Sequence, residues 1–345
     1  MIGPRIRVAV VAGGRSSEHE ISLASARSVL AALDPARYDV TTVAIDRGGR
    51  WQLESGTREE LPSGEESLAE TLPVPTNGRA PAALGRVDVV LPILHGPFGE
   101  DGTVQGLLEL ADVAYVGPGV AASALCMDKD LFKAVMRDRG IPVTRNLTLR
   151  RPDEAFTNPF GYPVFVKPAR LGSSVGITKA HDEAELRDAV ALAFRHDEKV
   201  LVEEFVEGTE VECGVLGNRD APMPSLVGEI VPVGHEWYDF SSKYDEGGAD
   251  IVVPARIPDE TAERVQQLAV ESFVATECEG MARVDFFVRP GGEVVVNELN
   301  TIPGFTETSV YARLFEATGI PYEELLDRLI RLALERRERR QNLRF

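Results

Sequence analysis

The chain has 345 residues, of which 43% are hydrophobic and 27% are charged, as in ordinary soluble globular proteins and unlike disordered ones. This length predicts two or three domains, at about 100–200 residues each. The 37 Lys and Arg residues against 55 Asp and Glu residues give a net charge of −18, which argues against electrostatic binding to DNA, RNA or anionic membranes. We therefore expect neither a nucleic-acid partner nor a membrane partner.

Cysteine usage and apolar runs bear on the location of the chain. Cys126, Cys213 and Cys278 are too widely spaced to predict a disulfide framework or a zinc site. The apolar run Val8–Ala12 is too short for the core of a signal peptide, and no stretch approaches the roughly 20 apolar residues of a membrane span. We therefore expect a cytoplasmic protein.

The first third of the chain alternates strand and helix patterns, which predicts a parallel α/β unit. Ser17 and Glu20 have the spacing of a capping box at the start of the first helix. Residues 54–81 show little periodicity and are expected to form a surface excursion. The predicted elements are strands 7–11, 40–45 and 87–94 and helices 20–33 and 103–111.

Two further blocks follow, separated by a junction expected near residues 217–222. A single helix over residues 122–139, closed by Gly140, leads into the first of them. The second block is predicted to contain strands 162–167 and 200–206 with helix 182–196 between them, and strands 210–216 and 225–231 adjoin the junction. The third is predicted to contain a polar loop at 235–250, helix 259–278, strands 281–288 and 293–298, and terminal helices.

The third block contains a hairpin with polar residues on one face. Gly291-Gly292 is a strong signal for a two-residue turn, and counting back from it pairs Asp285 with Glu298 and Arg283 with Asn300. Two facing carboxylates repel unless a cation lies between them, and carboxylate and amide oxygens suit Mg²⁺ or Mn²⁺. The alternative is a solvated outer face of the sheet, but this set of residues favours a metal site formed by Asp285, Glu298 and Asn300.

A magnesium ion with so few protein ligands usually also binds phosphate. The sequence has no P-loop motif, and Gly13-Gly14 lacks the spacing of a dinucleotide fingerprint. Lys167–Gly176 is a better candidate, because its glycines expose backbone amides, its hydroxyls add donors and Lys167 supplies charge. An ordinary hairpin loop is the alternative interpretation.

These motifs, in this order, resemble those of the ATP-grasp ligases and, among them, the D-alanine–D-alanine ligase family. The resemblance extends over nearly the whole chain. The segments that carry it are Gly13–Ser22, His95–Gly106, Met127–Lys129, Lys167–Gly176, Glu203–Val206, Lys243-Tyr244, Arg283–Asp285 and Glu298–Gly304.

The resemblance implies a fold and a reaction. The fold is an N-terminal parallel α/β domain (1–124) followed by a two-part ATP-grasp fold (125–217 and 218–345) that holds ATP between two sheets. ATP phosphorylates the carboxylate of one D-alanine, and the amine of a second D-alanine displaces the phosphate, giving the dipeptide used for peptidoglycan. The resemblance also implies two Mg²⁺ or Mn²⁺ ions as cofactors and a homodimer.

The resemblance assigns roles to individual residues. Glu18 binds the ammonium group of the first D-alanine, Ser309 binds the carboxylate of the second, and His95 lies at the substrate. Arg283 and the backbone amide of Gly304 stabilise the oxyanion. The ATP-binding residues are Lys129, Lys167, Ser174, Glu203, Glu204, Phe205, Val206, Glu210, Lys243 and Phe287.

The polar loop 235–250 resembles a mobile lid of the family that closes over ATP and excludes water. Glu18, Ser173 and Tyr244 are expected to form one hydrogen-bonded set. The Lys243-Tyr244 pair favours an amine acceptor, whereas related ligases that make D-alanine–D-lactate carry a different lid.

Plainer interpretations of single residues stay open. Glu18 could merely favour a helix N-terminus, His95 could be an ordinary loop histidine, Lys129 could be solvated and Ser309 could be an N-cap. For the chain as a whole, the alternatives are a D-alanine–D-lactate or other D-alanine–X ligase and a nucleotide-binding module without catalytic activity.

Overall fold

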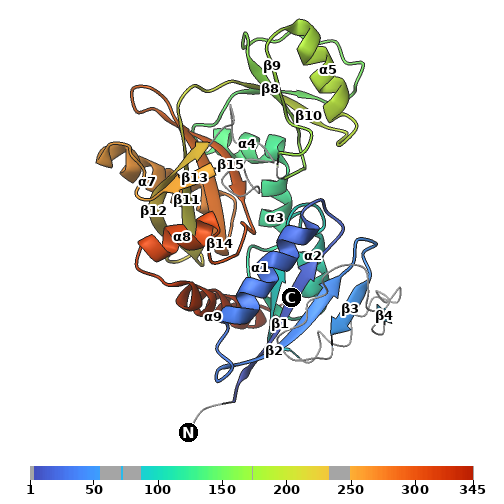
Figure 1. The fold of residues 1–345 in the computed structure, drawn as a ribbon, viewed down its shortest axis with the longest axis vertical. Coiled ribbons are helices and arrows are strands. Elements are labelled where there is room, and N and C mark those ends of the chain that lie inside the picture. The colour runs from blue at the N-terminus through green and yellow to red at the C-terminus, as the bar shows by residue number, and fades with distance from the viewer. Residues whose placement is uncertain (1–3, 55–70, 73–86, 173, 233–248, 345) are drawn as a thin grey trace.

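The computed structural model describes residues 4–54, 71–72, 87–172, 174–232 and 249–344 (Figure 1). Three sheets organise this part of the chain. The first has six strands in the order β4-β3-β2-β1-β5-β6, the second has four in the order β7-β10-β8-β9, and the third has five in the order β13-β12-β11-β14-β15. Among the described helices, none is both long and apolar enough to cross a bilayer.

The first sheet has a parallel centre, as predicted. Strand β1 (Ile6–Gly13) pairs with β2 (Tyr38–Ile45) and β5 (Val89–Ile93), and β5 pairs with β6 (Ala114–Tyr115). The sequence did not predict the two antiparallel strands that extend this sheet beyond β2. These are β3 (Trp51–Glu54) and β4 (Thr71–Leu72).

Helices cover both faces of the first sheet. One face packs against α1 (His19–Ala32) and against α9 (Tyr322–Gln341) from the other end of the chain. Helix α8 (Val310–Ala317) adds residues to the same core from its place on the third sheet. The opposite face packs against α2 (Thr103–Leu110). In Figure 1 the dark red helix α9 lies to the left of the blue first domain, beside α1, and the two ends of the chain share one hydrophobic core.

The predicted capping box at the start of α1 is wrong. The N-cap residue is Glu18, and its side chain makes no capping hydrogen bond. The amide of Glu18 instead donates to the hydroxyl of Ser16 (3.2 Å), and Glu20 forms an ion pair with Arg47 (2.9 Å). Helix α1 thus begins one residue earlier than predicted, with Glu18 directly before it.

The single helix predicted over residues 122–139 is two helices. Asp128 has extended backbone angles (φ −88°, ψ 97°) and separates α3 (Val120–Met127) from α4 (Lys129–Asp138). Its carboxylate accepts hydrogen bonds from the amides of Asp130 and Leu131, so Asp128 caps α4. The break lets α4 turn toward the second sheet.

The second and third sheets are antiparallel and are joined by residues 205–208. Helix α5 (Glu183–Ala193) covers the second sheet, and α7 (Asp259–Ala275) packs against the third. The strands of the second sheet are β7 (Asn146–Leu149), β8 (Val164–Pro168), β9 (Thr178–Ala180) and β10 (Val200–Glu204). The strands of the third are β11 (Thr209–Gly217), β12 (Met223–Pro232), β13 (Ala249–Val252), β14 (Gly280–Val288) and β15 (Val294–Asn300).

The expected domain boundaries stay predictions. The boundary after residue 124 falls within α3, and the boundary after 217 falls in the turn between β11 and β12, which pair in the same sheet. The sheet pairing favours a division at residues 205–208 instead, because β10 and β11 belong to different sheets.

Candidate functional site

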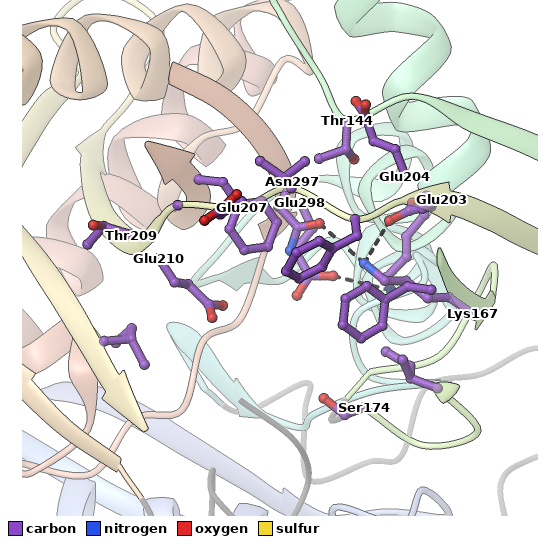
Figure 2. Close-up of a pocket in the computed structure, with 18 of the residues that line it drawn as sticks. Thr144, Lys167, Ser174, Glu203, Glu204, Glu207, Thr209, Glu210, Asn297 and Glu298 are labelled. Atoms are coloured by element: carbon purple, nitrogen blue, oxygen red, sulfur yellow. Dashed lines mark hydrogen bonds and ion pairs between the residues drawn. The ribbon is translucent and has the colours of Figure 1, made fainter. Parts of the chain in front are cut away.

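Two adjoining cavities lie where the three sheets meet. The hinge cavity, about 490 Å³, lies between the second and third sheets and is bounded by residues 203–210 (Figure 2). The inner cavity, about 520 Å³, lies between the first domain and the third sheet. Gly172, Ile230 and Glu298 line both cavities, so the two cavities meet at these residues.

The structure brings together most of the residues predicted for the site. The hinge cavity contains the described residues that the resemblance assigns to ATP, and the inner cavity contains most of those assigned to the amino acids. The predicted residues that line the hinge cavity are Lys129, Lys167, Ser174, Glu203, Glu204, Phe205, Val206, Glu210, Phe287 and Glu298. Those that line the inner cavity are Glu18, His95, Arg283, Glu298, Asn300, Gly304 and Ser309.

Some predicted residues lie outside the described residues. These are Ser173, Lys243, Tyr244 and the loop 235–250 except its last two residues. The expected set of Glu18, Ser173 and Tyr244 and the expected lid therefore stay predictions.

Buried charges form one wall of the hinge cavity. The Glu203 carboxylate, on β10, contacts Lys167 Nζ through Oε2 (2.7 Å) and Lys133 Nζ through Oε1. Lys167 Nζ also lies 3.3 Å from Asn297 Oδ1. Burial would raise the pKa of Glu203, but the two lysines lower it to about 2, so the carboxylate is charged at neutral pH.

Lys129 lies at the start of α4, where the break at Asp128 directs it toward the cavities. Its ammonium group donates to the Leu171 carbonyl (2.7 Å) and lies 3.4 Å from Glu298 Oε2. Only 7% of the residue is exposed, so the solvated lysine considered from the sequence is excluded. Lys129 thus links the phosphate-loop candidate to the carboxylate predicted to bind metal.

The hairpin β14–β15 reaches the predicted pairing by an unpredicted route. The turn has three residues, 290–292, closed by a hydrogen bond from the Arg289 amide to the Glu293 carbonyl (2.8 Å). This shifts the first pairs by one residue, and a bulge at Asn297 shifts them back. Asp285 therefore faces Glu298, and Arg283 faces Asn300, as the sequence predicted.

The bulge also places two successive polar residues at the hinge cavity. Asn297 and Glu298 both line it, although neighbouring residues of a regular strand point to opposite faces. Figure 2 shows both side chains near Lys167. The bulge is thus what lets Asn297 meet a lysine of the second sheet while Glu298 faces Lys129.

Asp285 lies beneath the inner cavity in a network of hydrogen bonds. Arg283 donates to both of its carboxylate oxygens at 2.8 Å, and Asn300 Nδ2 donates to Oδ2 at 3.0 Å. Arg283 also pairs with Glu212 (2.8 Å). This network fixes the orientation of the Arg283 guanidinium group and of the Asn300 amide.

The donor set of the predicted metal site fits a hard cation. Asp285 and Glu298 face one another across the ladder, and Asn300 adds an amide oxygen. Within the described residues, no three His, Cys, Asp or Glu side chains gather closely enough to hold an ion by themselves. A cation at Asp285, Glu298 and Asn300 would therefore need oxygen atoms from a ligand to complete its coordination.

Glu18 enters the inner cavity between two glycines. A Cβ atom on Gly96 would lie 2.4 Å from Glu18 Oε2, and one on Gly172 would lie 3.2 Å from it. Gly96 also has a φ of +73°, which disfavours other residues. The Glu18 carboxylate can lie this close to both backbone segments because neither glycine carries a side chain. Glu18 is 6% exposed.

His95 and Glu100 hold the backbone of Ile302 from two sides. His95 Nδ1 donates to the Ile302 carbonyl (3.0 Å), and Glu100 Oε1 accepts the Ile302 amide (2.9 Å). Glu100 Oε2 accepts the Gly96 amide (2.7 Å). Burial lowers the pKa of His95, which leaves it neutral at pH 7. The first domain therefore fixes the segment that leads to Gly304.

Ser309 occupies the N-cap position of α8, but its side chain does not cap the helix. Its hydroxyl accepts the amide of Thr306 (2.9 Å) and lies 2.7 Å from the Thr306 hydroxyl. Ser309 also lines the inner cavity. Ser309 is therefore the N-cap residue of α8, but its hydroxyl group makes no capping hydrogen bond.

Comparison with known proteins agrees with this geometry. The family model described as D-ala D-ala ligase N-terminus matches residues 7–118, and the one described as D-ala D-ala ligase C-terminus matches residues 135–331. A D-alanine–D-alanine ligase of Solibacter usitatus is 48% identical over 345 residues, which cover 99% of each chain. The chain belongs to the D-alanine–D-alanine ligase family.

Solved structures of this family share the fold. The VanG D-Ala:D-Ser ligase of Enterococcus faecalis matches with a TM-score of 0.83 and 38% identity over 96% of this chain and 100% of that one. The Bacillus anthracis D-alanine–D-alanine ligase complexed with ATP matches with a TM-score of 0.77 and 26% identity over 97% and 100%. The predicted fold class, a parallel α/β domain followed by a two-part ATP-grasp fold, is confirmed.

In this D-alanine–D-alanine ligase family member, sequence reasoning missed three residues of the site. Lys133 carried a usable signal, since it follows Lys129 by one helical turn. Glu100 was part of a motif but received no role. Asn297 gave no signal, because only the bulge brings it to the hinge cavity.

Proposed function

We propose that this chain joins two D-alanine molecules to D-alanyl-D-alanine with consumption of ATP, for peptidoglycan precursors. The observation that carries the proposal is the meeting of the two cavities at Glu298 and Gly172. The hinge cavity has the lysines that a triphosphate requires, and the inner cavity has the carboxylate and guanidinium groups that an amino acid requires. Membership of the family supports the same conclusion.

ATP would bind in the hinge cavity. Glu203 and the backbone of Glu204–Val206 would bind the adenine, with Phe287 against the ring and Glu210 at the ribose. Lys129, Lys167 and Ser174 would bind the phosphates, together with Lys243. The ligation starts when the terminal phosphoryl group passes to the carboxylate of the first D-alanine, which forms an acyl phosphate and releases ADP.

Asp285, Glu298 and Asn300 would hold Mg²⁺ or Mn²⁺, and the resemblance implies two such ions. When bound, the metal neutralises charge on the transferred phosphate. The protein also places two cations next to these metal ligands. Lys129 Nζ lies 3.4 Å from Glu298 Oε2, and Arg283 donates to Asp285 at 2.8 Å.

The two D-alanine molecules would lie in the inner cavity. Glu18 would bind the ammonium group of the first and Ser309 the carboxylate of the second, with His95 at the substrate. The amine of the second attacks the acyl phosphate. Arg283 and the Gly304 amide would stabilise the resulting oxyanion, which collapses with loss of phosphate. Ser173 and Tyr244 are proposed to assist Glu18.

A second candidate reaction differs only in the acceptor. The VanG neighbour, 38% identical, is named a D-Ala:D-Ser ligase, so the shared fold accommodates a different second substrate. D-Serine keeps the attacking amine and adds a hydroxyl group, whereas D-lactate replaces the amine. The Lys243-Tyr244 pair favours an amine acceptor over D-lactate. The relative named a D-alanine–D-alanine ligase, which is 48% identical, favours D-alanine over D-serine.

The test is a phosphate-release assay with ATP and Mg²⁺. We expect release with D-alanine, little with L-alanine or without an amino acid, and D-alanyl-D-alanine as the product by mass spectrometry. Chelation of divalent cations should abolish release, and added Mg²⁺ or Mn²⁺ should restore it. Adding D-serine or D-lactate beside D-alanine identifies the acceptor. ADP formation that ignores D-alanine would contradict the proposal.

Two further expectations belong to the same proposal. The chain would act in the cytoplasm, where ATP is available, and it would form a homodimer as the family resemblance implies. Sedimentation of the purified protein at several concentrations would test the dimer.

A further inference from the structure

Lys133 is a charged residue that ends inside the protein. It lies on α4 and is 0% exposed. Its ammonium group contacts the Thr144 hydroxyl and Glu203 Oε1. Its neighbours Thr144, Glu203 and Lys167 are among the described residues that line the hinge cavity, and Lys133 lies behind them. Burying a lysine side chain costs free energy unless its charge is paired and hydrogen-bonded.

The Glu203 carboxylate is shared between two lysines. One oxygen contacts Lys133, and the other lies 2.7 Å from Lys167 Nζ. Burial lowers the pKa of Lys133 to about 8, opposed by Glu203, so the ammonium form prevails at pH 7. Without Lys133 both carboxylate oxygens would be available to Lys167, which would then be drawn away from Asn297 and from the cavity.

Lys133 also fixes helix α4. The start of this helix is tied to the second sheet by Lys199 Nζ, which lies 2.6 Å from Asp128 Oδ2. The contact between Lys133 and Glu203 ties it to β10 one turn further along. Two attachment points fix the orientation of α4 and therefore the direction of Lys129, which lies on the same face as Lys133.

Both described lysines that line the hinge cavity thus depend on Lys133, one through Glu203 and the other through α4. We infer that Lys133 is a positioning residue for nucleotide binding, which holds Glu203 and α4 so that Lys167 and Lys129 present their ammonium groups to the phosphates. The inference rests on the proposed function, since it takes the ligand of the hinge cavity to be ATP.

The experiment compares ATP binding in three variants of the full chain. Lys133→Met keeps most of the length of the side chain and removes the charge, and Lys133→Arg keeps the charge. Met136→Ala is the matched control, because Met136 lies on the same helix and is fully buried in the core of the third sheet. The Kd of ATP with Mg²⁺ is measured by titration calorimetry without D-alanine. The KM for D-alanine at saturating ATP and the unfolding midpoint are measured alongside.

We expect Lys133→Met to raise the Kd of ATP about ten-fold or more, because one buried partner of an ion pair is lost, while the KM for D-alanine changes less than about two-fold. Lys133→Arg should bind ATP more tightly than Lys133→Met. Met136→Ala should lower the unfolding midpoint and leave the Kd of ATP within about two-fold of wild type. A residue with a purely structural role would not separate the two substrates in this way.

Unchanged ATP binding in Lys133→Met, or equal weakening in Met136→Ala, would overturn the inference. If Lys133→Met does not fold, Lys133→Gln takes its place, since it keeps a hydrogen-bond donor without the charge, and the same weakening is expected. A wild-type chain that does not bind ATP would contradict the proposed function instead, so the two failures are distinguishable.

Discussion

Glu100 is a buried carboxyl group held by backbone amides from two distant parts of the chain, Gly96 and Ile302. Burial raises its pKa from an ordinary value of 4.5 to about 8, and the neighbouring Glu18 adds to this, although the two amides oppose it. The group is therefore mostly protonated at pH 7.

The raised pKa of Glu100 predicts a pH dependence of stability. A carboxyl group whose pKa is higher in the folded state contributes stability below pH 4.5 that is lost as the pH rises toward 8. Glu100→Gln does not titrate. The free energy of unfolding of wild type minus that of the variant should thus fall between about pH 5 and pH 8, by at most about 1.4 kcal/mol per pH unit.

Urea denaturation at several pH values measures this difference. Glu20→Gln, on the exposed side of α1, controls for the loss of one negative charge. A difference between wild type and Glu100→Gln that stays constant over this pH range would contradict the raised pKa.

Among the elements, the break between α3 and α4 has the clearest energetic origin. Asp128 caps α4 and also accepts a charge-assisted hydrogen bond from Lys199 (2.6 Å). Asp128→Asn should keep the cap and lose only the ion pair, whereas Asp128→Ala should lose both. We expect the alanine variant to be less stable than the asparagine variant by about 0.5–2 kcal/mol, the usual value of a cap.

Urea denaturation of both Asp128 variants at pH 7 tests this expectation. Equal stability of the two would mean that the cap contributes nothing and that the ion pair alone maintains the break.

The elements that the sequence predicted are those with a local signal. Short β-rich apolar runs that alternate with helical segments identified the parallel strands of the first domain. The glycine turn identified the hairpin with the facing pair Asp285 and Glu298. The break at Asp128 was missed because the apolar pattern continues across it, although aspartate is a common N-cap residue. Its second partner, Lys199, is 71 residues away. The bulge at Asn297 escaped because strand alternation gives no sign of an inserted residue.

In the candidate site, too, the features with a local sequence signal were predicted and the long-range contacts were not. Residues in motifs were predicted to cluster, and the two cavities bring them together. The supporting contacts of Lys133 and Glu100 were not predicted, because each joins segments that are far apart in the chain. Lys133 contacts Glu203, 70 residues away, and Glu100 contacts Ile302, 202 residues away.

For the molecule as a whole, the net charge of −18 does not describe the hinge cavity. Lys129 and Lys167 line it and Lys133 lies behind them, so ATP phosphates would meet lysines at this wall although six glutamates also line the cavity. At long range the acidic surface should hinder ATP slightly. Raising the ionic strength from about 0.01 M to about 0.15 M shortens the Debye length from about 30 Å to about 8 Å and should not slow association.

Stopped-flow measurement of ATP association over this range provides the check. A steep decrease of the association rate constant with salt would mean that attraction by the site outweighs repulsion by the whole chain.

The packing of α9 against the first sheet has a consequence for protein synthesis. Leu325, Leu329 and Ile330 of α9 share one core with Val8 and Val10 of β1. Arg336 of α9 donates to the carbonyls of Tyr115, the last residue of β6, and of Gly117. Strand β1 is therefore synthesised well before the helix that completes its core. Until α9 has been synthesised, the part of this apolar face that α9 covers is exposed in the nascent chain, and chaperones would bind there.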